Sequence, residues 1–374
     1  MTLNFEHVTL GQRVRFGTGK AAENLSAEVE RLGARRIMLI ASESDAPMAA
    51  AVSSGVDVVL HYHDVAPHVP IEKAEKARAA AIEHDADLLV CVGGGSTTGL
   101  AKAVAMTTAL PIIAVPTTYA GSEATNVWGL TEASRKATGV DDAVLPVTVI
   151  YDAELALSLP AHLSVASGLN ALAHCIDSMW APRADPINQA LASEGIRALA
   201  AGLPLIKDNP ADLAGREQAL YGAYLSAVAF ASAGSGMHHK ICHVLGGAYN
   251  LPHAQTHAVV LPYVLAFNAP FAPHAERRIA AAFGSDDAVT GLSDLRSALA
   301  APTSLKEHGL NEADIPEAVE LILPAIPASN PRRVTAENLD ELLRAAYAGS
   351  TLPGSTETAT TGTATTRDKE TSHA

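Results

Sequence analysis

The sequence predicts an α/β domain built on a parallel sheet, followed by an all-α domain. Over the first 150 residues short apolar runs alternate with helical stretches, as in parallel sheets covered by helices on both faces. After Pro160 long stretches rich in Ala and Leu show helical periodicity, and from Gly349 onward Thr, Ser and Gly dominate. We therefore expect an α/β domain over 1–157, a helical domain over 158–349 and a disordered tail over 350–374.

Five apolar runs are the expected strands. Each run is continuous rather than alternating, which is typical of parallel strands buried on both faces. The expected strands span 36–41, 56–62, 87–92, 111–115 and 147–150. The expected helices span 22–32 and 71–84 in the first domain, and 164–181, 187–206, 211–233 and 236–247 in the second.

The charge balance limits the possible partners. The chain has 26 basic and 40 acidic residues, a net charge of −14, and no basic run, which argues against nucleic acid or an anionic membrane as partner. No apolar stretch approaches the ~20 residues of a membrane span. The odd number of cysteines, Cys91, Cys175 and Cys242, is typical of reduced thiols, so we expect a cytoplasmic protein.

Two polar segments follow expected strands. Gly93-Gly94-Gly95-Ser96 comes directly after 87–92 and opens a helix, where backbone N–H groups and the helix dipole favour a pyrophosphate. The hydroxyl-rich run from Pro116 to Thr125 follows 111–115, at the sheet edge where open α/β sheets bind ligands. Each segment alone is also compatible with a turn that binds no ligand.

A group of histidines carries the strongest chemical pattern. Asn170 and His174, and likewise His239 and His243, are four residues apart and share a helical face, while His253 follows a proline and is expected in a loop. Two helical pairs and one loop residue almost make a metal site. The anionic ligand is missing, because neutral Asn170 stands where an acid would be expected.

Other histidines show no such pattern. A residue next to His239 points about 100° away around the helix, and isolated histidines are more often structural than catalytic. We therefore expect structural roles for His61, His63, His68, His162 and His238.

In order and spacing, the glycine-rich turn, the 116–125 loop and the histidine segment resemble the iron-containing alcohol dehydrogenase family over roughly residues 5–348. Three details favour its maleylacetate-reducing branch. The loop reads Pro-Thr-Thr-Tyr-Ala-Gly-Ser-Glu, where the alcohol dehydrogenases usually carry Pro-Thr-Thr-Ala-Gly-Thr-Gly-Ser-Glu. Gly99 stands where they usually carry Asp, and Asn170 stands where they carry the metal-binding Asp.

The resemblance implies a Rossmann-like first domain, NADH or NADPH as cofactor, a homodimer, and an oxidoreductase of aromatic-compound catabolism. The implied reaction is reduction of maleylacetate, a small dicarboxylate, to 3-oxoadipate. One alternative is a metal-dependent alcohol or polyol dehydrogenase of the same family. A more distant alternative is a lyase that resembles dehydroquinate synthase, which would need a denser set of Lys and Arg than this chain offers.

The resemblance also assigns roles at the site. The metal ligands of the relatives correspond here to Asn170, His174, His239 and His253, and His243 matches a further active-site histidine. Because Asn170 supplies no charge, we expect no metal. His243 and His253 are then the leading hydrogen-bond donors, and His174 and His239 position the substrate. The expected substrate-binding residues are Asn170 and Tyr119.

The resemblance places Ser42 where folds that demand NAD commonly use an acid to hold the ribose 2′-OH. Serine permits both cofactors, although the neighbouring Glu43 could still reach the ribose. The expected cofactor-binding residues are Ser42, Gly94, Gly95, Ser96, Thr117, Thr118, Ser122 and Lys136.

Overall fold

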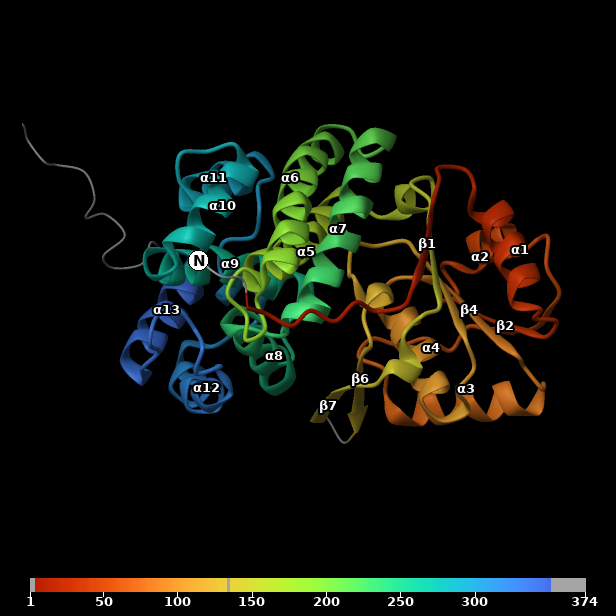
Figure 1. Cartoon of the computed structure of the whole chain (residues 1–374). Coiled ribbons are helices and arrows are strands. Elements are labelled where there is room, and N and C mark those ends of the chain that lie inside the picture. The colour runs from red at the N-terminus through yellow and green to blue at the C-terminus, as the bar shows by residue number, and fades with distance from the viewer. Residues whose placement is uncertain (1–3, 133–134, 351–374) are drawn as a thin grey trace, which may run out of the picture.

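The structure, a computed structural model, describes residues 4–132 and 135–350. It confirms the predicted fold class, because a parallel six-stranded sheet precedes a region made of helices (Figure 1). The strand order is β1-β8-β5-β4-β2-β3. The strands are β1 (Arg13–Phe16), β2 (Ile37–Ile40), β3 (Val58–Tyr62), β4 (Leu88–Gly93), β5 (Ile112–Pro116) and β8 (Thr148–Tyr151).

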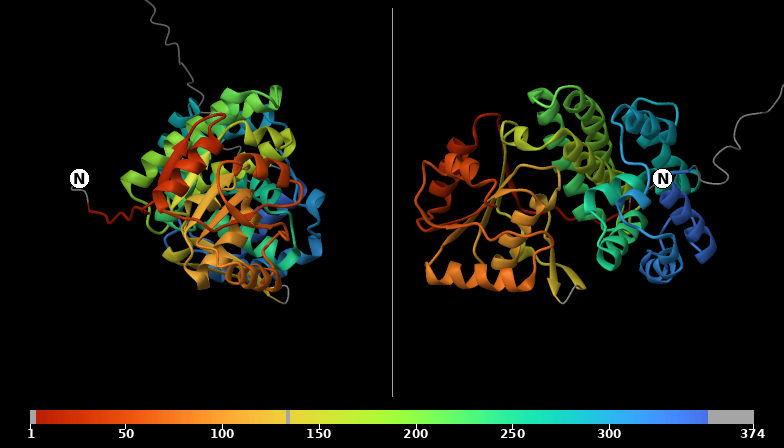
Figure 2. Two further views of the ribbon diagram at one scale, coloured as in Figure 1. Left: turned by 90° about the vertical axis from the view of Figure 1, so that its right-hand side faces the viewer. Right: turned by 180° about the vertical axis from the view of Figure 1, so that it is seen from behind.

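Helices cover both faces of the sheet, as continuous apolar strands require. Side chains alternate between the faces along each strand, so Ile37 and Leu39 pack with one set of helices while Met38 and Ile40 pack with the other. The first face carries α1 (Ala21–Leu32) and α2 (Ala46–Val52), and the opposite face carries α3 (Ile71–Glu83) and α4 (Gly95–Thr108). The two layers flank the sheet in Figures 1 and 2.

Several elements differ from the sequence prediction. β1 lies at the sheet edge beside β8, and charged Arg13 and Arg15 interrupt its apolar pattern. A two-stranded antiparallel hairpin, β6 (Val127–Glu132) and β7 (Arg135–Val140), lies outside the main sheet and was not predicted. Neither segment has the continuous apolar run by which the buried strands were identified.

The helical region has two cores that meet along one helix. The first joins α5, α6, α7, α10 and α11, the second joins α8, α12 and α13, and α9 contributes to both. The helices are α5 (Ala161–Ser178), α6 (Pro186–Asp208), α7 (Leu213–Ala233), α8 (Met237–Tyr249), α9 (His253–Asn268), α10 (Pro273–Phe283), α11 (Ala288–Ala298), α12 (Ile315–Ile322) and α13 (Ala336–Ala348). His253 is thus the first residue of α9 and not a loop residue, which corrects one expectation.

The predicted boundary after residue 157 falls within the short 3-10 helix η3 (Leu155–Ser158), between β8 and α5, and stays a prediction. Of the predicted tail, residues 351–374 lie outside the described residues. In the part of the chain that is described, none of the helices is long and apolar enough to cross a membrane.

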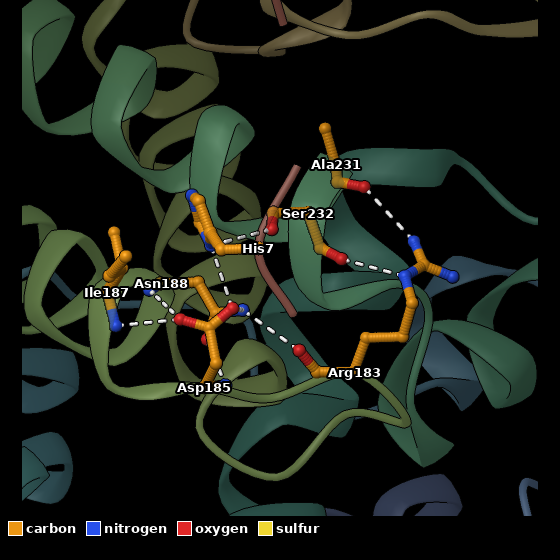
Figure 3. A network of polar contacts seen from close by, with 7 residues as sticks. All are labelled: His7, Arg183, Asp185, Ile187, Asn188, Ala231 and Ser232. Carbon is orange, nitrogen blue, oxygen red and sulfur yellow. Dashed lines mark hydrogen bonds and ion pairs between the residues drawn. The ribbon is translucent and has the colours of Figure 1, made fainter. Parts of the chain in front are cut away.

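The segment before β1 runs along the helical region and ties it to the sheet (Figures 1 and 3). His7 Nδ1 lies 2.7 Å from Asp185 Oδ2 and 3.2 Å from Ser232 Oγ. Asp185 also caps α6, because its Oδ1 accepts from the backbone N–H groups of Ile187 and Asn188. Residues before and after the sheet domain therefore share one polar network.

The closest helix pair in the second region is α6 with α7. A Cβ on Gly202 would lie 2.7 Å from the Gly215 carbonyl oxygen and 3.0 Å from the Ala219 backbone nitrogen. Because both neighbours are backbone atoms, the helices would have to move apart to accept a larger side chain.

We predict that Gly202→Val destabilises the protein by about 1–3 kcal/mol through overpacking. The midpoint of thermal unfolding should fall by a few degrees, at roughly 2–4 °C per kcal/mol. Gly11→Val is the matched control, because a Cβ there meets nothing within 4 Å. Equal unfolding midpoints for the two variants, measured by calorimetry, would contradict the predicted contact.

Candidate active site

The predicted cofactor loops lie side by side at the carboxyl edge of the sheet. β4 and β5 are neighbours, Gly93 is paired with Pro116, and the Thr117 N–H donates to the Gly93 carbonyl at 3.1 Å. A Cβ on Gly94 would lie 3.0 Å from Thr118 Cγ2. The glycine therefore allows close contact between the two loops, and the first turn of α4 opens beside them.

This edge gathers most of the predicted cofactor residues. Ser122 begins the short 3-10 helix η1 (Ser122–Ala124) at the end of the second loop. Lys136 lies in β7, but its side chain is outside the described residues. The residues that the structure brings together here are Gly94, Gly95, Ser96, Thr117 and Thr118.

An acid that the sequence reasoning missed is Asp45, the N-cap residue of α2 in the connection that follows β2. Ser42 Oγ donates to Asp45 Oδ2 at 2.6 Å. The same Asp45 oxygen would lie 3.3 Å from a Cβ placed on Gly93. The Asp45 carboxylate therefore reaches the glycine-rich turn from the start of α2.

Buried charges hold the second loop in place. Lys102 Nζ donates to the carbonyls of Thr125 and Val127, each at 2.7 Å, and burial lowers the pKa of Lys102 to about 7. Glu123 accepts from the Tyr151 hydroxyl at 2.9 Å, and burial raises the pKa of Glu123. These contacts join α4, β6 and β8 beneath the loop.

Tyr119 does not lie with the site histidines. Its side chain is buried in the core shared with the helical region, and its hydroxyl oxygen accepts from Arg216 Nη1 at 3.0 Å. Arg216 is itself fully buried and also donates to Ser164 Oγ at 2.7 Å. These contacts tie the loop to α5 and α7, whereas substrate binding by Tyr119 stays a prediction.

The four predicted histidines meet in one group, in which His174 and His239 are buried, His243 is partly buried and His253 is exposed. The rings of His174 on α5 and His239 on α8 stack with centroids 4.8 Å apart. His243 lies one turn after His239, with ring centroids 6.0 Å apart, and His253 of α9 is 6.4 Å from His243. Asn170 lies one turn before His174 on α5 and is also buried.

A fifth histidine, His257, joins this group and was missed by the sequence reasoning. Its ring lies 4.4 Å from His253 and 4.9 Å from His239. His238, expected to be structural, hydrogen-bonds to His257 through Nε2 and Nδ1 at 2.9 Å. The spacing of His253 and His257 was a usable signal, but it was overlooked because His253 was expected in a loop.

The acid that seemed to be missing is Asp177. Its Oδ2 lies 2.8 Å from His239 Nδ1 and accepts from the Gly236 N–H at 2.9 Å, and its Oδ1 accepts from the His238 N–H at 3.4 Å. A carboxylate on one ring nitrogen fixes the tautomer and leaves the other nitrogen as a ligand. Asp177 is three residues after His174, so it belongs to the same face of α5.

The four buried histidines of this group are neutral near pH 7. Burial lowers the pKa of His174 and of His238 to about 3, and lowers the pKa of His239 and of His257 well below the ordinary value. Burial also raises the pKa of Asp177 to about 7, although hydrogen bonds from the backbone N–H groups at the start of α8 act to lower it. Neutral imidazole is the form that binds a metal ion.

The available atoms fit a divalent metal. Asn170 Oδ1, His174 Nδ1 and His239 Nε2 are buried and have no hydrogen-bond partner among the described residues. Unpaired buried acceptors are costly unless something binds them. Imidazole nitrogens with one amide oxygen make a set that suits Fe²⁺ or Zn²⁺.

Comparisons with known proteins agree with this geometry. Residues 11–153 match the family model described as iron-containing alcohol dehydrogenase, and residues 164–347 match the C-terminal model of the Fe-containing alcohol dehydrogenase family. Maleylacetate reductase of Pseudomonas sp. (strain P51) is 43% identical over 349 residues, which cover 93% of this chain and 99% of the relative.

Two solved structures are similar over nearly their full length. An iron-containing alcohol dehydrogenase from Corynebacterium glutamicum is 63% identical, with a TM-score of 0.92 over 93% of this chain and 98% of that chain. Maleylacetate reductase from Agrobacterium tumefaciens is 39% identical, with a TM-score of 0.89 over 94% of this chain and 100% of that chain.

The expectation of a site without metal is wrong. Both halves of the chain match a family that is described as iron-containing. The expectation rested on Asn170 as the lost anionic ligand. It overlooked Asp177, whose carboxylate lies directly behind His239.

We predict that Asp177→Asn lowers the metal affinity of the protein about ten- to hundredfold, as loss of such a carboxylate partner typically does. The measurement is the metal content per chain after dialysis against a graded series of chelator. Asp152→Asn is the control, because Asp152 is also buried but binds backbone N–H groups of the sheet domain. Equal metal retention in the Asp177 variant and wild type would contradict the role given to Asp177.

Proposed function

From the premise that the chain belongs to the iron-containing alcohol dehydrogenase family, we propose that it reduces maleylacetate to 3-oxoadipate with NADH or NADPH. One observation carries the proposal: the chain resembles maleylacetate reductases at more than 40% identity along nearly its whole length. The proximity of the 116–125 loop to the histidine group also supports it, because a Cβ on Gly121 would lie 3.6 Å from the His174 ring, so a nicotinamide cofactor bound at this edge would have hydrogen-bond donors nearby.

The chemistry of the substrate explains what the site must do. Maleylacetate is an enone with a carboxylate at each end. A hydride from the nicotinamide adds to the alkene carbon β to the ketone, and the electron pair of the alkene moves toward the ketone oxygen as an enolate. A proton then adds to the carbon next to the ketone, which gives 3-oxoadipate and the oxidised cofactor. The protein must therefore bind two carboxylates, stabilise an enolate and deliver one proton.

Particular residues meet these needs. A divalent ion held by Asn170, His174, His239 and His253 would polarise the ketone oxygen when bound. His243 is assigned to the proton, because it lies beside these residues and lines the same pocket as His253. Its imidazole lies on the partly buried side of the histidine group.

The charge distribution suits a dianionic substrate. Asp177 is buried behind His239, and its oxygens accept from the Gly236 and His238 N–H groups at the start of α8. The positive end of the helix dipole therefore faces the carboxylate. Asn170 stands at the other side of the group and adds no charge, so the site avoids a second anion near the substrate.

One alternative function is favoured by a specific observation. The structure that is 63% identical bears the name iron-containing alcohol dehydrogenase. Under this alternative the same residues would hold a metal, and the protein would oxidise alcohols with NAD⁺. The two functions share the fold and the cofactor, so only the substrate separates them.

The cofactor preference follows from Asp45. In dinucleotide folds an acid at the end of the strand next to the glycine-rich turn holds the ribose 2′-OH and repels a 2′-phosphate. Asp45 lies at that place, with Ser42 hydrogen-bonded to it. We therefore propose that both cofactors bind and that NADH binds more tightly.

We also propose that the protein is a homodimer and that it is located in the cytoplasm. Two copies of the chain are expected to associate, and exposed apolar Phe5 and Val8 in the N-terminal segment offer surface for such a contact. Cys91, Cys175 and Cys242 are buried free thiols, which suits a reducing cytoplasm.

We predict that the purified protein oxidises NADH when maleylacetate is added, and that dialysis against a chelator lowers this rate at least tenfold. Fe²⁺ or Zn²⁺ should restore the rate, because the metal-binding atoms are neutral and remain in place. The comparison assay is NAD⁺ reduction with primary alcohols and polyols. Faster turnover of an alcohol than of maleylacetate would favour the alternative function.

We predict that Asp45→Asn raises kcat/KM for NADPH relative to NADH about tenfold, a change of ~1.4 kcal/mol. The amide keeps a hydrogen bond to Ser42 but no longer repels the 2′-phosphate. Glu43→Gln serves as the control, since Glu43 was the acid considered from sequence. The assignment of Asp45 fails if the Glu43 variant shows the larger change.

A further inference from the structure

A histidine of the sheet domain lies at the mouth of the histidine group. His68 follows β3, and it lines one small pocket with His243 and His253 of the helical region. Cys242, Gly246, Gly247 and Leu251 complete the lining. The pocket therefore joins residues from both halves of the chain, and a ligand in it would contact His68 from one side and His243 from the other.

The backbone at His68 adopts a rare conformation. His68 has a φ of 61° and Val69 a φ of 47°, both in the left-handed region. This region disfavours residues with a Cβ, and β-branched valine most of all. Such strain persists only when surrounding contacts impose it, and it is common at sites that bind ligands.

The surrounding contacts are specific. Thr131 of β6 donates through Oγ1 to the His68 carbonyl at 2.8 Å and through its N–H to the Val69 carbonyl at 3.1 Å. Val69 is 5% exposed and packs in the core between α3, α4 and the sheet. The hairpin and the core together fix the turn that presents His68.

Gly99 explains how Val69 fits. A Cβ on Gly99 would lie 2.8 Å from Val69 Cγ2, closer than real Cβ contacts allow. Any larger side chain on this turn of α4 would displace Val69, and His68 precedes Val69 directly. The absence of a side chain at residue 99 is therefore a condition for the position of His68.

The α8 wall of the pocket carries two glycines. Gly246 and Gly247 are consecutive glycines within α8, where glycine costs about 1 kcal/mol relative to alanine. A Cβ on Gly247 would meet nothing within 4 Å, so no packing contact requires the glycine. The absence of side chains at these two positions keeps this part of the pocket wall open.

We propose that His68 is a substrate-binding residue that donates a hydrogen bond to one carboxylate of the dicarboxylate substrate. His243 contacts the rest of the substrate from the helical region. Through Val69, Gly99 acts as a positioning residue for His68. This inference rests on the proposed function and extends it, because it names the residue that selects a second carboxylate.

The test compares His68→Ala, His68→Gln and Gly99→Ala with wild type in steady-state kinetics. His68→Ala should raise the KM for maleylacetate at least tenfold and change kcat less than threefold, while the KM for NADH stays the same. His68→Gln keeps an N–H donor and should recover part of the loss. Gly99→Ala should reproduce the rise in KM, and His61→Ala, an exposed histidine on β3, should behave as wild type.

Two analogues that each lack one carboxylate, 4-oxopent-2-enoate and 3-oxohex-4-enoate, show whether His68 binds a carboxylate. The effect of His68→Ala should vanish with one analogue and persist with the other. An unchanged KM for maleylacetate, or equal losses with both analogues, would overturn the assignment.

A calorimetric measurement separates this inference from the proposed function. If wild type does not reduce maleylacetate, the proposed function fails, and binding of adipate to wild type and to His68→Ala then decides the role of His68. The inference expects at least tenfold weaker binding by the variant. Equal affinities, or no adipate binding by wild type, would refute it.

Discussion

The contact between Asp177 and the start of α8 is the constraint on which the site depends. One carboxylate binds the Gly236 and His238 N–H groups and His239 Nδ1, and so fixes the place where α8 begins. A Cβ on Gly236 would lie 2.4 Å from Asp177 Oδ1, so the approach requires glycine. Once α8 begins there, helical spacing determines which histidines face α5 and α9.

A second set of buried polar groups holds the loop that follows β5 in place. Lys102 is fully buried and donates to the carbonyls of Thr125 and Val127, so a shift of the loop after β5 would leave a buried amine without its hydrogen-bond partners. Arg216 binds Tyr119 from the helical side. The loop is therefore held from the sheet side and from the helical side.

Regular periodicity made the fold class and the four principal histidines predictable, because strand runs and i, i+4 pairs are local patterns. The residues that were missed depend on contacts distant in sequence. Asp177 meets His239 across 62 residues, and His68 reaches the pocket from the other domain. His257 could have been predicted, because it is four residues after His253 on the same helix. It was missed because His253 was expected in a loop. The edge strand β1 carried too much charge to be recognised.

The error about the metal has the same origin. From the sequence, Asn170 was interpreted as a metal ligand that had lost its charge, and each ligand was considered by itself. In the folded chain an acidic group is still present, because the Asp177 carboxyl group binds His239 Nδ1 and so acts on the histidine group through the His239 ring. Because the anion lies behind an imidazole, the atoms left unpaired among the described residues, Asn170 Oδ1, His174 Nδ1 and His239 Nε2, are neutral. Such an arrangement reconciles a site for a cation with a substrate that carries two negative charges of its own.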